Sequence, residues 1–122
     1  MTDIMGNLLA VTVHAANIHD TVAGGEVLKK ALKNYATITG VCADAGYRKT
    51  FEAAVAELGL NVDISERIKP DGWQILPKRW RIERTFAWMN NSRRLSKDYE
   101  IRTCSAASMV VISHISTIIK RF

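Results

Sequence analysis

The stretch ITGVCADAGYRKTFEAAVAELGLNVDI, residues 38–64, decides the fold class. It holds an apolar run at 38–43, an amphipathic segment at 51–58 and a second apolar run at 60–64. Two apolar runs joined by a helical segment of this length are typical of a βαβ unit, in which parallel strands are linked by a right-handed crossover. We therefore predict two strands and a helix here, with Thr50 capping the helix and Gly59 ending it.

The residues before this unit continue the pattern. Residues 8–15 are mostly apolar, which predicts another strand, buried on both faces. A helix should follow from Asp20, its predicted N-cap, although Gly24 and Gly25 each weaken its first turns by about 1 kcal/mol relative to Ala. Its core-facing side chains are expected to be Val27, Leu28, Ala31, Leu32 and Tyr35.

The residues after the unit predict a polar loop and two more helices. A turn at residues 70–72 interrupts the polar stretch 65–76. A helix over residues 78–91 should bury Ile82, Phe86 and Met89, which recur at helical spacing. A helix over about 105–120 is apolar on most sides, as expected for one that covers a sheet. The fold class is α/β: a mixed or parallel sheet with helices on its faces, in one domain spanning residues 1–122.

Composition allows a globular domain with a mild preference for polyanions. The chain has 122 residues, 48% of them hydrophobic, and a net charge of +5, although many soluble bacterial domains are equally basic. Cys42 and Cys104 sit in apolar surroundings and are expected to be buried free thiols in a reducing cytosol. The longest apolar stretch, residues 106–119, is too short to span a bilayer. A cytoplasmic protein that does not enter membranes is expected.

Two acidic residues, Asp44 and Glu83, stand at positions suited to a metal site. Asp44 directly follows the apolar run 38–43, and Glu83 lies on the expected helix 78–91. Ligands of α/β sheets bind beyond the carboxyl ends of the strands, so both carboxylates are expected to converge there, within about 8 Å, and to hold Mg²⁺ or Mn²⁺. Alternatively, Asp44 merely ends a strand and Glu83 pairs with arginines of its own helix.

Basic and aromatic side chains surround Glu83. Arg79 and Arg84 flank it and suit a phosphate ligand, and Arg93, Arg94 and Lys97 form a second basic group that either contacts phosphate or is solvated surface. Tryptophans spaced in this way are more often core than stacking platforms for an unpaired base. They are Trp73, Trp80 and Trp88. The histidines lack zinc spacing, so structural roles are expected for them. They are His14, His19 and His114.

Three ordered segments resemble the C-terminal half of DDE transposases of bacterial insertion sequences. They are Ala43-Asp44-Ala45-Gly46-Tyr47-Arg48, the stretch from Leu76 to Trp88, and the stretch from Arg93 to Glu100, with an upstream match at residues 8–20. The resemblance implies an RNase H-like catalytic fold, two divalent metals and the cutting and joining of DNA at transposon ends. It implies that Asp44 and Glu83 are metal ligands.

The resemblance also implies a missing part. Three acidic residues bind the metals in that family, and the first lies on a strand before the segment matching residues 8–16. Asp3 resembles a turn aspartate of the family, which is not a ligand. We therefore expect a truncated catalytic domain with a partial RNase H-like fold, its opening strands missing, that is inactive by itself. The expected partners are DNA at transposon ends and either an upstream transposase half or further copies of the chain. The alternative is a non-catalytic DNA-binding or oligomer-forming remnant.

Overall fold

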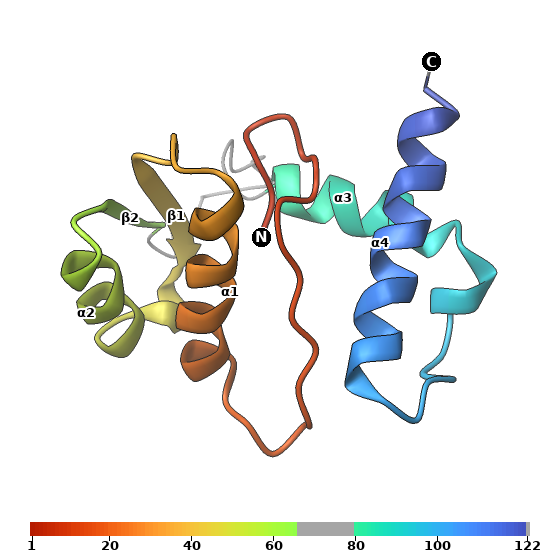
Figure 1. Cartoon of the computed structure of the whole chain (residues 1–122), viewed down its shortest axis with the longest axis horizontal. Helices are drawn as coiled ribbons and strands as arrows, with labels where there is room; N and C mark the ends of the chain where they lie inside the picture. The colour runs from red at the N-terminus through yellow and green to blue at the C-terminus, as the bar shows by residue number, and fades with distance from the viewer. Residues whose placement is uncertain (66–79, 122) are drawn as a thin grey trace, which may run out of the picture.

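The computed structural model describes residues 1–65 and 80–121 and is an α/β arrangement in two groups (Figure 1). The strands and the helices that pack on them form one group, the last helices of the chain form the other, and the N-terminal segment runs between them. The elements in chain order are α1 (Asp20–Asn34), β1 (Gly40–Asp44), the 3₁₀ turn η1 (Ala45–Tyr47), α2 (Thr50–Glu57), β2 (Asn61–Ser65), α3 (Trp80–Asn90), the 3₁₀ turn η2 (Arg93–Leu95) and α4 (Thr103–Ile119).

The predicted βαβ unit is confirmed. β1 and β2 are parallel, in a register that runs from Gly40 opposite Asn61 to Asp44 opposite Ser65. The strands begin and end within two residues of the predicted limits, and α2 links them. The α/β class and the parallel pairing are consistent with the expected partial RNase H-like fold. Both strands end at one edge, which therefore carries Asp44.

The ends of α2 were predicted only in part. Gly59 ends the helix as expected, with a φ of +69° that favours glycine. Thr50 is not the cap, because the N-cap is Lys49, whose N–H donates to Glu52 Oε2 at 3.0 Å. Lys49 has φ +69° and ψ −84°, and the Thr50 N–H donates to Arg48 O at 3.1 Å. This pattern is a γ-turn with positive φ.

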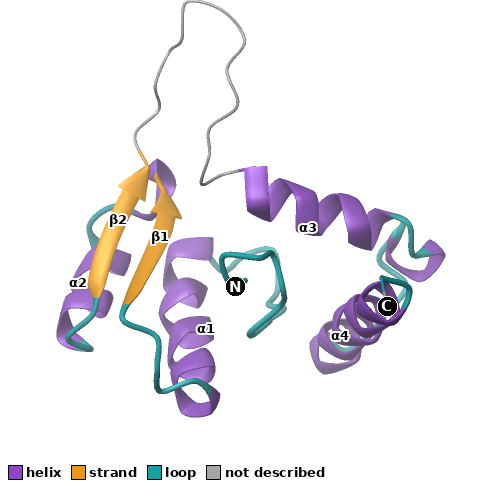
Figure 2. Cartoon of the chain, turned by 90° about the horizontal axis from the view of Figure 1, so that it is seen from above, coloured by secondary structure: helices purple, strands orange, loops and turns teal. Residues whose placement is uncertain are grey.

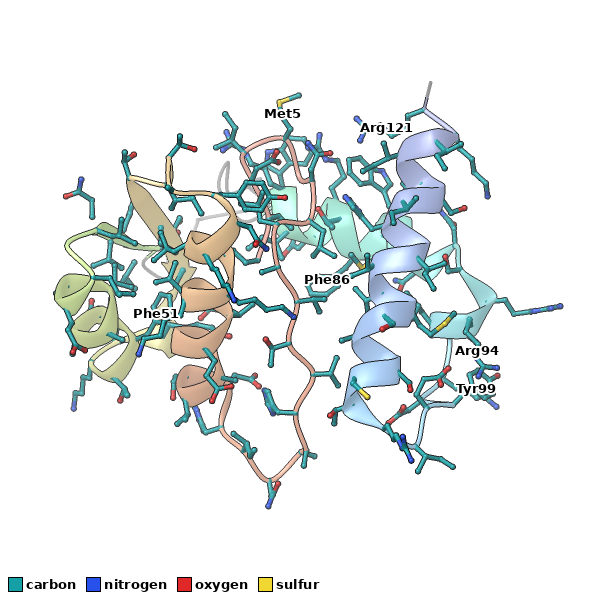
Figure 3. The ribbon with its side chains drawn as sticks, in the orientation of Figure 1. Met5, Phe51, Phe86, Arg94, Tyr99 and Arg121 are labelled. Carbon is teal, nitrogen blue, oxygen red and sulfur yellow. The ribbon has the colours of Figure 1, made fainter. Side chains whose placement is uncertain are left out.

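The core of this group lies where α1 and α2 pack together and against the strands. Leu28, Phe51 and Val55 are buried there, and Figure 3 shows Phe51 between the two helices. α1 also buries Ala23, Gly24 and Ala31, as its sequence pattern indicates in part, but Tyr35 is exposed. The predicted cap Asp20 is wrong as well: His19 is the N-cap, and its Nδ1 accepts the Thr21 N–H at 3.3 Å.

The predicted strand over residues 8–15 is wrong. The segment carries only an isolated antiparallel bridge between Thr2 and Leu8, and it runs between α1 and α4 (Figure 1). Side chains of these helices satisfy its backbone: Lys30 Nζ donates to Val11 O at 2.9 Å, and the Leu8 N–H donates to His114 Nε2 at 2.9 Å. The mostly apolar residues 8–14 are half-buried beside the helices, with Ala10 buried, and do not pair as a strand.

The N-terminal loop, residues 3–7, connects the start of the chain to α3. Asp3 shapes it as a turn residue, because its Oδ1 accepts the N–H groups of Met5 and Asn7, both at 2.8 Å. Two loop carbonyls then accept hydrogen bonds from one turn of α3: the Thr85 hydroxyl donates to Gly6 O at 2.8 Å, and Arg84 Nη2 donates to Met5 O at 2.7 Å. The loop therefore docks on α3 through backbone carbonyls.

The expected buried faces of the last two helices need correction. In α3, Met89 is buried as predicted, but Ile82 and Phe86 are 43% and 61% exposed. The buried polar residue of α3 is Thr85, since that side of α3 faces the N-terminal loop.

α4 packs on α3 and η2 rather than covering the sheet. Its exposed apolar residues are Val111, Ile112, Ile115 and Ile119.

The predicted burial of the two cysteines is wrong. Cys42 and Cys104 are free thiols, but both are exposed rather than buried. Cys42 lies on β1, whose side chains alternate between exposed and half-buried, and Cys104 lies in the first turn of α4. None of the helices in residues 1–65 and 80–121 combines the length and the hydropathy needed to cross a bilayer.

Replacing Thr85 with Val should lower the free energy of unfolding by about 1–3 kcal/mol, because the Gly6 carbonyl would lose its buried donor without any change in side-chain volume. Thr117→Val is the matched control, since the Thr117 hydroxyl donates only to Ser113 O of its own helix. Urea denaturation of the three proteins measures the difference. Equal losses in the two variants would contradict the role of Thr85 in docking the loop.

His114 should make stability depend on pH. Its side chain is buried, and Nε2 accepts the Leu8 N–H, which requires an unprotonated nitrogen. Burial lowers the pKa of His114, as does the charge of Arg121, while Asp3 opposes them. The unfolded chain therefore binds a proton more readily than the native one, so stability is complete above the unfolded pKa of about 6.5 and falls as pH decreases below it.

The variant His114→Gln separates this effect from other titrations, because a Gln amide oxygen can accept the Leu8 N–H but does not titrate. Between about pH 7.5 and pH 5, the free energy of unfolding should fall more steeply in the wild type than in the variant. All other residues are the same in the two proteins, so the difference between their profiles reports residue 114. Parallel pH profiles would rule out a lowered His114 pKa.

Candidate functional site

Asp44 stands where β1 ends and η1 begins. It is exposed, and it is the N-cap of η1, because its Oδ1 accepts the Gly46 N–H at 2.9 Å. Ser65, at the end of β2, is its partner in the register, and the Ser65 hydroxyl lies 3.5 Å from Cys42 Sγ. The carboxylate is thus held at the carboxyl edge of the strand pair with a fixed orientation.

Tyr47 closes the turn that holds Asp44. Its ring packs edge-on against Phe51, with 5.3 Å between ring centroids and 72° between planes. Burial raises the pKa of Tyr47, and the negative charges of Asp20 and Asp44 raise it further. The Tyr47 phenol therefore lies within electrostatic reach of the Asp44 carboxylate. No pattern in the sequence predicts this electrostatic influence of Asp44 on Tyr47.

Glu83 lies in the first turn of α3 and is exposed. α3 packs on α4 and η2, whereas β1 packs on β2 and η1, so the two carboxylates belong to different packing groups. Figure 2 shows the ends of β1 and β2 and the start of α3 on the same side of the molecule. The convergence of Asp44 and Glu83 stays a prediction. In residues 1–65 and 80–121, no group of three or more His, Cys, Asp or Glu side chains could hold a metal ion.

Arg84 is fixed between two tryptophans. Its guanidinium lies 4.3 Å from the ring centroid of Trp80 and 4.8 Å from that of Trp88, and Arg121 stacks on Trp88 at 4.5 Å. With the hydrogen bond to Met5 O, these contacts give Arg84 a structural role. Trp80 is 38% exposed and Trp88 is half-buried, so neither is a full core residue. The spacing of residues 80, 84 and 88 on one helix face was the signal for this stack.

The second basic group follows α3. Arg93, Arg94 and Lys97 are all exposed. Arg94 is engaged, because its Nε and Nη2 both lie 2.8 Å from Glu100 Oε1 and its guanidinium stacks on Tyr99 at 5.4 Å. Figure 3 shows Arg94 and Tyr99 side by side. Arg79 and Trp73 lie outside the described residues, so their predicted roles remain predictions.

Comparison with known proteins gives one result. A family model described as "Transposase DDE domain" matches residues 1–114. This match includes Asp44, Glu83 and every basic residue of the two groups considered above. No curated protein and no solved structure shows a significant match.

Proposed function

The chain belongs to the transposase DDE domain family, and we propose that it acts in DNA transposition through a divalent-cation site that includes Asp44 and Glu83. The observation that carries this proposal is the family match across both carboxylates, together with the position of Asp44 at the carboxyl edge of a parallel strand pair. Ligands of α/β proteins bind beyond that edge.

The donor chemistry of the two residues suits Mg²⁺ or Mn²⁺, because hard divalent cations prefer carboxylate oxygens. The Gly46 N–H occupies one acceptor position of Asp44, and a carboxylate offers about four, so capacity for a cation remains. Bound metal ions would activate the attacking hydroxyl group and stabilise the leaving oxygen of a DNA phosphodiester. Asp44 would act as an oriented ligand, and Glu83 would supply a second ligand from the first turn of α3.

A complete site for two metal ions needs more ligands than these two. The described residues bring no third carboxylate to Asp44 and Glu83 in a metal-binding group, so we propose that the remainder comes from another polypeptide, either an upstream transposase half or a second copy of the chain. Cleavage and joining by this chain alone should therefore be weak or absent. The alternative, a non-catalytic DNA-binding or oligomer-forming protein, draws its support from the same observation.

We also propose that Arg93 and Lys97 contact the DNA backbone without reading sequence. Both are exposed, Arg93 in η2 and Lys97 shortly after it. Cationic side chains that neutralise phosphate make binding salt-dependent. Arg84 and Arg94, by contrast, already hold partners within the chain. Any contact from these two to phosphate would compete with those partners. Arg79 stays a candidate on the family resemblance.

Titration with Mn²⁺ tests the metal site. Binding should broaden amide resonances around β1 and η1, and Asp44→Asn and Glu83→Gln should each weaken it by about tenfold or more, since each removes one of two charged ligands. Asp98→Asn is the matched control: it removes an exposed carboxylate near η2 with the same change in net charge. If neither Asp44→Asn nor Glu83→Gln weakens Mn²⁺ binding, the result supports the non-catalytic alternative.

Salt-dependent DNA binding tests the basic group. Arg93→Gln and Lys97→Gln should each flatten the slope of log affinity against log salt by about 0.9, similarly on all duplex sequences. Arg94→Gln should change the slope less, because Glu100 already neutralises this side chain in part. Arg84→Gln should instead lower the thermal unfolding temperature. Unchanged slopes for Arg93→Gln and Lys97→Gln would make these residues ordinary solvated surface.

A further inference from the structure

We propose that Gly24 and Tyr47 are positioning residues for Asp44: the absence of a side chain at residue 24 lets α1 seat the Tyr47 ring, and the seated ring holds the turn that orients the Asp44 carboxylate. The inference rests on the proposed metal-binding role of Asp44. It adds a constraint from α1, an element that carries none of the proposed ligands.

The fit around Gly24 is tight. Gly24 is buried in α1, and a Cβ built on it would lie 3.0 Å from Tyr47 Cε1 and 3.0 Å from Phe51 Cδ2. Real Cβ contacts are rarely so short, and here both neighbours are aromatic rings in an edge-on pair. The backbone at Gly24 is helical, so the requirement is for space rather than for an unusual φ.

The neighbouring glycine provides the contrast. A Cβ on Gly25 would lie 3.8 Å from Ala54 Cβ, which is an ordinary van der Waals distance. Glycine is unfavourable in a helix relative to alanine. At residue 25 the described surroundings give no steric reason for it, whereas at residue 24 the two rings do. The pair therefore separates the effect of packing from that of helix propensity.

The turn transmits the position of Tyr47 to Asp44. η1 contains only residues 45–47, with Asp44 as its N-cap and Tyr47 as its last residue. The Gly46 N–H, between them in the turn, holds Asp44 Oδ1 at 2.9 Å. Displacement of the Tyr47 ring would therefore shift Gly46 and loosen the hydrogen bond that orients the carboxylate. Space at Gly24 thus sets the direction of a side chain on a different element.

The test compares Gly24→Ala with Gly25→Ala in the full chain. Two quantities are measured: the affinity for Mn²⁺, and the hydrogen exchange rate of the Gly46 amide relative to the Val62 amide in β2. Outer-shell residues that orient ligands typically change metal affinity by about 10–100-fold, so Gly24→Ala should weaken Mn²⁺ binding by about tenfold. It should also speed exchange at Gly46 more than at Val62. Gly25→Ala should leave both quantities close to wild type.

Two substitutions at Tyr47 complete the test. Tyr47→Phe keeps the ring and should retain Mn²⁺ binding, whereas Tyr47→Leu should weaken it and speed Gly46 exchange. The Leu variant removes the ring instead of crowding it, so it decides the matter if Gly24→Ala does not fold. Equal losses in the Phe and Leu variants would overturn the inference, because the hydroxyl rather than the packed ring would then orient the turn.

The outcomes for the inference and for the proposed function are distinguishable. If wild-type chain shows no Asp44-dependent Mn²⁺ binding, the proposed function fails, and the exchange rate at Gly46 still decides the positioning role. Faster exchange in Gly24→Ala and Tyr47→Leu, but not in Gly25→Ala, supports the role. If Mn²⁺ binds and Gly24→Ala matches Gly25→Ala in both measurements, the inference is wrong while the metal site stands.

Discussion

The hydrogen bond from the Thr85 hydroxyl to Gly6 O is the contact on which the arrangement of the two groups depends. It joins residues 79 positions apart, and Thr85 is only 2% exposed. Its neighbours on either side, Arg84 to Met5 O and Leu8 to His114, extend the same clamp along α3 and α4. The same N-terminal segment contacts the group that holds the strands, because Met1 packs against the core of Leu28, Phe51 and Val55 and Lys30 Nζ donates to Val11 O. The segment therefore links α3, which carries Glu83, to that group.

Elements that depend on local sequence pattern can be predicted from the sequence. Predictions fail for elements whose structure depends on contacts with residues distant in the chain. The βαβ unit was visible because residues 38–64 contain both strands, the crossover helix and its glycine stop. The apolar residues 8–15 predict a strand, since an apolar run looks the same whether it packs between strands or beside helices. For the same reason Ile82 and Phe86 were assigned to the core, although the side of α3 that carries Thr85 faces the N-terminal loop.

The candidate site shows the same division. The position of Asp44 at the end of a strand followed from the apolar run before it, and its orientation by Gly46 follows from the turn. The engagement of Arg84 could have been read from tryptophans four residues to either side, whereas the pairing of Arg94 with Glu100 depends on the path of the chain after η2. No pattern within α1 predicts that Gly24 touches Tyr47, because the contact joins two elements whose relative placement emerges only on folding.

The γ-turn at Lys49 has a consequence for how the region after Asp44 can evolve. A non-glycine residue with φ +69° and ψ −84° carries local strain of about 1–3 kcal/mol. Such a conformation persists only where its surroundings impose it, here through the buried Phe51 that follows and the bond from Lys49 N–H to Glu52. Glycine at this position would relieve the strain but loosen the link between the Asp44 turn and α2. A change of Lys49 to glycine would therefore raise the stability of the folded chain but make the backbone beside the candidate site less rigid.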